Sequence, residues 1–100
     1  MVRDDVRERH LGFHYPRAWQ RLRMRLFDAA FPRVPSVVAW LEDDGAALRV
    51  RVALPERVLA WEERFTPEEL RAADGRWAEW VEWIARAVAP TDAAPENSAS

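Results

Sequence analysis

Apolar residues recur at helical spacing between Pro16 and Ala30. The residues that share one helical face in this segment are Trp19, Leu22, Leu26, Phe27 and Ala30. Proline suits the first turn of a helix, where Pro16 lies, and Pro32 cannot continue a helix beyond that point. The pattern therefore predicts a helix over Pro16–Ala30. Just upstream, the alternation of apolar residues over Leu11–Tyr15 predicts a short edge strand.

Residues 36–54 alternate apolar and polar side chains on both sides of Asp43-Asp44-Gly45, which predicts a β-hairpin. Two registers fit this pattern. A two-residue loop sets Trp40 opposite Arg49, and the other face of the hairpin then pairs Leu41 with Leu48, Ala39 with Val50 and Val37 with Val52. A three-residue loop instead moves Trp40 onto the face of Leu48, Val50 and Val52, because a slip of one residue exchanges the faces.

In either register the second hairpin face combines apolar groups with Arg49 and Arg51. A two-stranded hairpin is marginally stable by itself and needs other elements to cover it. We therefore expect both faces of the hairpin to be covered.

The segment Pro55–Arg64 fits two structures. Its composition favours a helix, with Val58, Trp61 and Phe65 at positions i, i+3 and i+7, and we prefer this interpretation. The alternative is a third strand in which Leu59, Trp61 and Phe65 share a face.

A second helix start is visible at Thr66, where the side chain of Glu69 can complete a capping box and Pro67 occupies the first turn. We expect helix from Pro67 toward Ala89, with a break at Asp74-Gly75, because glycine disfavours helix. The residues on its apolar stripe are Trp77, Trp80, Val81, Ile84 and Val88, with Trp83 to one side.

Together these elements predict the fold class α+β, in which the hairpin, with or without a third edge strand, packs against the N-terminal helix and the tryptophan-rich C-terminal helices. We expect a single domain over residues 1–89, with fraying at 1–9. Residues 90–100 are small, polar or acidic, so they predict a disordered tail.

The six tryptophans are the most distinctive compositional feature. Aromatic residues and arginine are enriched at protein interfaces, and the predicted apolar surface is wider than a small hairpin covers. The candidate interface residues are Trp40, Trp77, Trp80 and Trp83. The leading hypothesis is a non-catalytic protein–protein interaction module, either a homodimer or an accessory subunit of a larger assembly, whose partner is itself or another protein.

Charge supports an alternative. All basic residues are arginine, and Arg17, Arg21 and Arg25 form one stripe of the first helix, with Arg49 and Arg51 available to extend it. Guanidinium groups bind phosphate oxygens, so the alternative hypothesis is a nucleic-acid-binding protein. Against it stand a net charge of -2 and an acidic C-terminal half that can neutralise the stripe.

Other chemistry has little support in the chain. There is no cysteine, the three glycines are scattered, and no nucleophile lies in a recognisable motif, so we expect no enzyme activity and no cofactor. His10 and His14 are four residues apart, but Gly12 and Pro16 argue against a helix that would aim both at one metal, and no metal site is predicted. Without an apolar leader or a span of about 18 apolar residues, the expectation is a cytoplasmic protein with no membrane partner.

Overall fold

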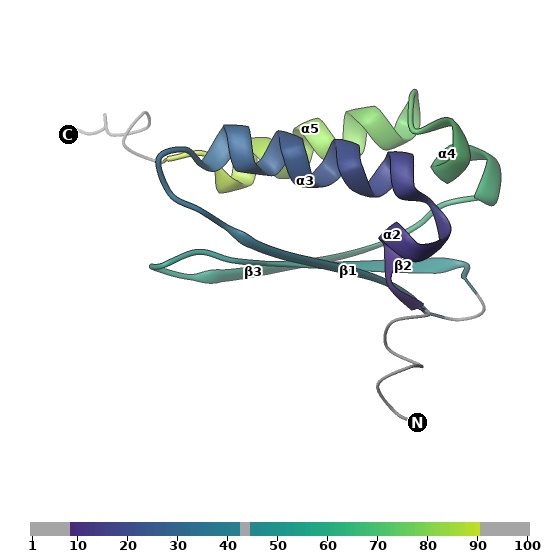
Figure 1. Ribbon diagram of the computed structural model, residues 1–100, viewed down its shortest axis with the longest axis horizontal. Helices are drawn as coiled ribbons and strands as arrows, with labels where there is room; N and C mark the ends of the chain where they lie inside the picture. The colour runs from purple at the N-terminus through teal and green to yellow at the C-terminus, as the bar shows by residue number, and fades with distance from the viewer. Residues whose placement is uncertain (1–8, 43–44, 91–100) are drawn as a thin grey trace.

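The computed structural model describes residues 9–42 and 45–90, which form a layer of helices on one layer of antiparallel sheet (Figure 1). In chain order the elements are α2 (Leu11–His14), α3 (Pro16–Ala30), β1 (Ser36–Glu42), β2 (Ala47–Ala53), β3 (Val58–Arg64), α4 (Pro67–Ala72) and α5 (Arg76–Val88). The strand order is β1-β2-β3, and helices α3 and α5 lie side by side above the sheet. The predicted fold class, α+β, is confirmed.

Helix α3 has the predicted bounds, with Pro16 in its first turn. Its fully buried residues are Ala18, Leu22, Leu26 and Ala30. Phe27, which the pattern placed on the apolar face, is 39% exposed, and the guanidinium of Arg23 lies 5.7 Å from its ring centre. The buried stripe is therefore narrower than predicted, and small residues bring α3 close to its neighbours.

The β1–β2 hairpin has the register of the two-residue-loop alternative. The pairs on the helix-facing side are Val37 with Val52, Ala39 with Val50 and Leu41 with Leu48. Trp40 faces the other way and lies opposite Arg49. Within the described residues only one face of the hairpin is covered, because Val38, Arg49 and Arg51 on the second face are exposed. Two helices are enough to cover only one side of a small sheet.

The segment that we preferred as a helix is a strand, β3, and the alternative interpretation was right. Leu54 and Arg57 exchange two backbone hydrogen bonds, N to O, of 2.8 and 3.3 Å around Pro55-Glu56, which closes a tight turn after β2. This turn returns the chain beside β2, where Trp61 lies opposite Val50. Ladder pairing along β2 outweighs the helix-forming composition, since propensity is a weak preference that tertiary contacts override.

The edge strand predicted over Leu11–Tyr15 is also wrong, because this segment forms the short helix α2. The Nδ1 atom of His10 caps the helix by accepting a hydrogen bond from the backbone N–H of Gly12 at 3.0 Å. A Cβ at position 12 would come within 2.7 Å of the Trp19 ring, so glycine here permits α2 to pack tightly on α3. Only His10 pairs with the sheet, as an isolated antiparallel bridge to Trp40.

The predicted start and break of the C-terminal helix are both confirmed. Thr66 and Glu69 form the capping box at the start of α4. Ala73, with φ of 60°, and Gly75, with φ of 55°, then turn the chain before α5 begins at Arg76. The side chains of Phe65, Trp77 and Trp80 meet at this end of the core, with ring centroids 5.1 to 5.6 Å apart.

Arginine side chains join the two layers and the helices. Arg76 at the start of α5 contacts Glu63 on β3 at 3.2 Å, and the Arg57 guanidinium donates to the carbonyl oxygen of Ala87 at 2.9 Å. Helix α5 therefore runs antiparallel along β3. No helix within residues 9–42 and 45–90 is both long and apolar enough to cross a membrane. The predicted tail, apart from Pro90, and the fraying predicted for residues 1–8 lie outside the described residues.

The burial of Trp77 generates a prediction about stability. Trp77 is fully buried, so Trp77→Ala should lower the free energy of unfolding by about 3–5 kcal/mol. Trp77→Phe should cost clearly less, because it keeps a buried ring and removes an indole N–H that finds no acceptor among the described residues. Urea denaturation of both variants measures the difference. Equal losses in the two variants would contradict this assignment.

Candidate functional site on the outer face of the sheet

The side of the sheet that points away from the helices is called the outer face here. It is formed by Val38, Trp40, Glu42, Arg49, Arg51, Ala60, Glu62 and Arg64, which alternate along the three strands with the residues that face the helices. The hairpin register places Trp40, a predicted protein-contact residue, beside Arg49 and Arg51, which were predicted phosphate ligands. The structure thus joins residues from the two functional hypotheses on one surface.

In one row across the outer face, neighbouring glutamates compensate the charge of an arginine. Trp40, Arg49 and Glu62 lie opposite one another on β1, β2 and β3. The Arg49 guanidinium lies 3.5 Å from the Glu62 carboxylate and 3.7 Å from that of Glu42, and Glu42 also accepts a 2.8 Å hydrogen bond from the indole N–H of Trp40. These contacts hold the Trp40 ring in place beside a neutralised arginine.

The adjacent row leaves a cation without a counterion. Arg51 lies between Val38 on β1 and Ala60 on β3, and neither neighbour carries charge. Among the described residues, Arg51 makes no ion pair, and its side chain is exposed. Val38 is 40% exposed beside it. This row therefore combines an open apolar surface with an available guanidinium.

Two hollows flank Trp40, and both are lined by Trp40 and Arg51. The larger, of about 470 Å³, extends across β2 to Ala60 and Glu62 on β3. The smaller, of about 340 Å³, extends over Val38 toward Arg9 and His10. The two residues thus form a shared ridge between neighbouring hollows, a shape that can receive side chains from an extended segment.

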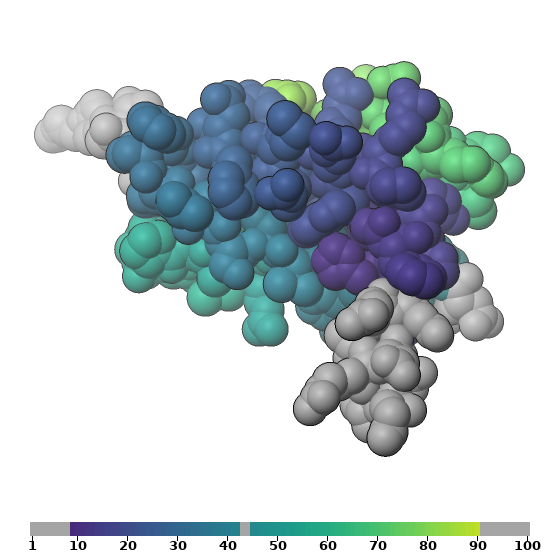
Figure 2. Space-filling view, viewed as in Figure 1, coloured from purple at the N-terminus to yellow at the C-terminus, as the bar shows by residue number. Residues whose placement is uncertain are grey.

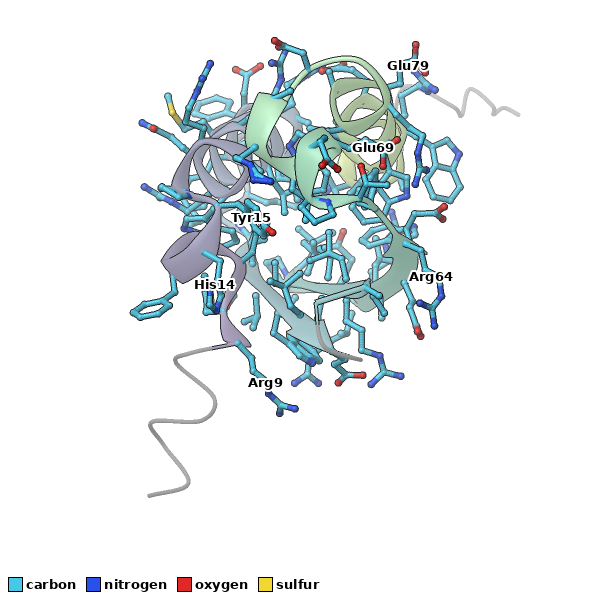
Figure 3. The ribbon with its side chains drawn as sticks, turned by 90° about the vertical axis from the view of Figure 1, so that its right-hand side faces the viewer. Arg9, His14, Tyr15, Arg64, Glu69 and Glu79 are labelled. Carbon is cyan, nitrogen blue, oxygen red and sulfur yellow. The ribbon has the colours of Figure 1, made fainter. Side chains whose placement is uncertain are left out.

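The N-terminal side of this surface is formed by Arg9 and His10, neither of which was predicted to belong to it with Trp40. Arg9 points away from the helices on the open side of the sheet (Figure 3). His10 packs edge-on against Trp19, with ring centroids 4.6 Å apart, and burial lowers the pKa of its imidazole. Their place could not be found from the sequence, because it depends on the isolated bridge between His10 and Trp40.

The remaining interface candidates divide between core and surface. Trp77 is fully buried and Trp80 is 9% exposed, so both belong to the core of the chain, and we no longer count them as surface candidates. Trp83 is 52% exposed on α5, in agreement with its offset from the apolar stripe. It lies in the helical layer and is not part of the outer face.

The predicted arginine stripe on α3 is largely engaged within the chain. Arg21 donates hydrogen bonds to the carbonyl oxygen of Ala73 at 2.9 Å and to the Asp74 carboxylate at 3.0 Å. Arg25 makes two hydrogen bonds to Glu82, of 2.8 and 3.0 Å, which raise the pKa of Arg25 and lower that of the Glu82 carboxyl.

Arg17 is exposed without an ion pair among the described residues. The stripe is also in the opposite layer from Arg49 and Arg51, so the structure does not bring the five candidates together.

Neither histidine joins a metal cluster in the described part of the chain, where no group of three or more His, Asp or Glu residues converges. The Nδ1 atom of His10 is already engaged as the cap of α2.

No family model matches the chain, and neither a curated protein nor a solved structure shows significant similarity to it.

The pairing of the α3 arginines generates a prediction for the nucleic-acid alternative. Because Arg21 and Arg25 already contact Asp74 and Glu82, we expect no binding of mixed-sequence duplex DNA or single-stranded RNA even at roughly 50 mM salt. Fluorescence anisotropy with labelled oligonucleotides measures this. Binding that weakens steeply with salt and is lost in Arg17→Glu would revive the alternative.

Proposed function

We propose that this chain is a non-catalytic protein-interaction module that binds a partner protein on the outer face of its sheet. The observation that carries the proposal is that Trp40 and the unpaired Arg51 together line both hollows of a face that the helices leave uncovered. Fully desolvated tryptophan and arginine side chains contribute most of the binding energy at many protein interfaces.

The chemistry of the outer face defines the partner. Trp40 and Val38 offer apolar contact, and Arg51 and Arg9 offer guanidinium groups without an acidic neighbour in the described chain. A complementary segment carries an aspartate or glutamate beside an aromatic or aliphatic residue. Its carboxylate pairs with Arg51 while its apolar side chain fills a hollow next to Trp40.

A phosphate-rich partner fits this surface less well. Four arginines of the outer face and its N-terminal side, Arg9, Arg49, Arg51 and Arg64, are accompanied by Glu42 and Glu62, and both glutamates lie within ion-pair distance of Arg49. Carboxylates on either side of Arg49 repel a phosphate backbone but tolerate a peptide that carries a single acid. The absence of catalytic activity and a cytoplasmic location are part of the same proposal.

Peptide selection against the immobilised full-length chain tests the proposal. We expect selected peptides to combine an acidic residue with a neighbouring apolar one. Arg51→Glu should weaken their binding by roughly tenfold or more, because a contact between opposite charges becomes repulsive. Trp40→Ala should weaken binding as well, and anisotropy titration of a labelled peptide measures both effects.

The matched control is Arg17→Glu, the same charge reversal on the exposed surface of α3. It changes the net charge of the chain identically but leaves the outer face untouched, so it should bind the selected peptides as the unchanged chain does. Peptides that bind the Arg51 and Arg17 variants equally well would overturn the proposal. So would a selection without enrichment of acidic residues.

A further inference from the structure

The free edge of β3 carries backbone hydrogen-bonding groups that point out of the sheet. The reciprocal bonds between Leu54 and Arg57 make this pair a hydrogen-bonded pair of the β2–β3 ladder. Such pairs recur at every second residue of an antiparallel ladder, so Leu59 and Trp61 direct their N–H and C=O groups toward β2. Val58, Ala60 and Glu62 consequently direct theirs away from the sheet, and the described residues supply no backbone partner for them.

The two edges of the sheet differ in how far other parts of the chain cover them. The β1 edge is bridged by His10 and contacted by α2. In Figure 2 the side chains of α2 lie in front of the right-hand end of the sheet on that side. The β3 edge has no such cover among the described residues, although an unprotected edge strand readily pairs with another strand.

An exposed tryptophan lies above the same edge. Successive residues of a helix are about 100° apart, so Glu82 and Trp83 occupy opposite flanks of the buried stripe of α5. Glu82 contacts Arg25 on α3, which places Trp83 on the flank away from α3. Because α5 runs along β3, that flank overhangs the open edge, where Trp83 is 52% exposed and Leu59 and Trp61 are half-buried.

The side chains of β3 select one register for pairing with a second copy. When two β3 strands pair antiparallel about Ala60, Leu59 of each faces Trp61 of the other, and Arg57 faces Glu63. The backbone N–H and C=O groups of Val58 in one copy then also lie opposite those of Glu62 in the other, so they can form hydrogen bonds. A pairing centred on Trp61 sets Leu59 against Glu63, and one centred on Glu62 sets two glutamates against each other. Only the pairing about Ala60 makes both the apolar and the charged contacts favourable.

We propose that two copies of this chain pair through their β3 edges about Ala60 and form one continuous antiparallel sheet. Trp83 of each copy is then covered at the twofold axis. This edge adjoins the outer face, since Ala60 and Glu62 belong to both, but the strand pairing does not depend on the partner binding proposed above. The pairing keeps both outer faces on the same side of the joined sheet, which doubles the site proposed above.

A charge exchange tests the register. In Arg57→Glu two glutamates face each other across the twofold axis, and in Glu63→Arg two arginines do. Each variant alone should therefore dimerise more weakly than the unchanged chain, by roughly tenfold or more in dissociation constant, given the energies of cross-strand charge pairs acting twice. An equimolar mixture of the two variants places opposite charges at both contacts and should form a heterodimer. Sedimentation velocity with one variant fluorescently labelled measures this.

Both variants also change a contact within the chain, since Arg57 donates to the Ala87 carbonyl oxygen and Glu63 pairs with Arg76. The mixture separates association from folding, because a merely destabilised chain is not rescued by another destabilised chain. Ala60→Pro provides a second test, since it removes an N–H that points away from β2 and should abolish the dimer while circular dichroism stays unchanged. The matched control Arg51→Glu alters the outer face and should leave the dimer intact. A monomeric unchanged chain at high micromolar concentration, or variants that fail to associate on mixing while the unchanged chain is dimeric, would overturn the proposal.

Discussion

The packing of α3 and α5 against one side of a three-stranded sheet is the interaction on which the remaining features depend. Trp77, Phe65 and the residues of the sheet that face the helices form a single core between the two layers. Burial of this apolar area is the dominant favourable contribution to folding. Because both helices are committed to the same side, the opposite side of the sheet and one of its edges remain available for contacts with other molecules.

Arginine contributes mainly to joining the elements of the chain. Arg21 and Arg25 connect α3 to the segment from α4 to α5, and Arg76 connects α5 to β3. Each exposed ion pair of this kind contributes little to the free energy of unfolding. The pairs nevertheless occupy the N–H donors of the guanidinium groups, so these donors are no longer available to another molecule. A count of arginines therefore overestimates the cationic surface, and the unpaired Arg51 is more informative than the stripe on α3.

The sequence predicted the elements whose signals are local. The bounds of α3, the capping box of Thr66 and the hairpin near Gly45 each rest on residues within a few positions of one another, and all are confirmed. The assignments that failed have no such turn or capping signal and depend on how the segment pairs or packs with a neighbouring element. The segment of β3 is a strand because a tight turn brings it back beside β2, where Trp61 pairs with Val50. The segment of α2 is a helix that packs closely on α3, because Gly12 has no Cβ to collide with the Trp19 ring. Composition contains no information about either contact.

The same reasoning applies to the candidate site. Trp40 could be singled out, but the hairpin register decided its face, and only the fold placed His10 beside it. His10 also contacts Trp19, whose helix belongs to the other layer. The smaller hollow beside Trp40 and the helical layer therefore share one side chain, because the imidazole that lines the hollow also packs against the ring of Trp19. A ligand in that hollow lies next to a contact that holds α2 on α3.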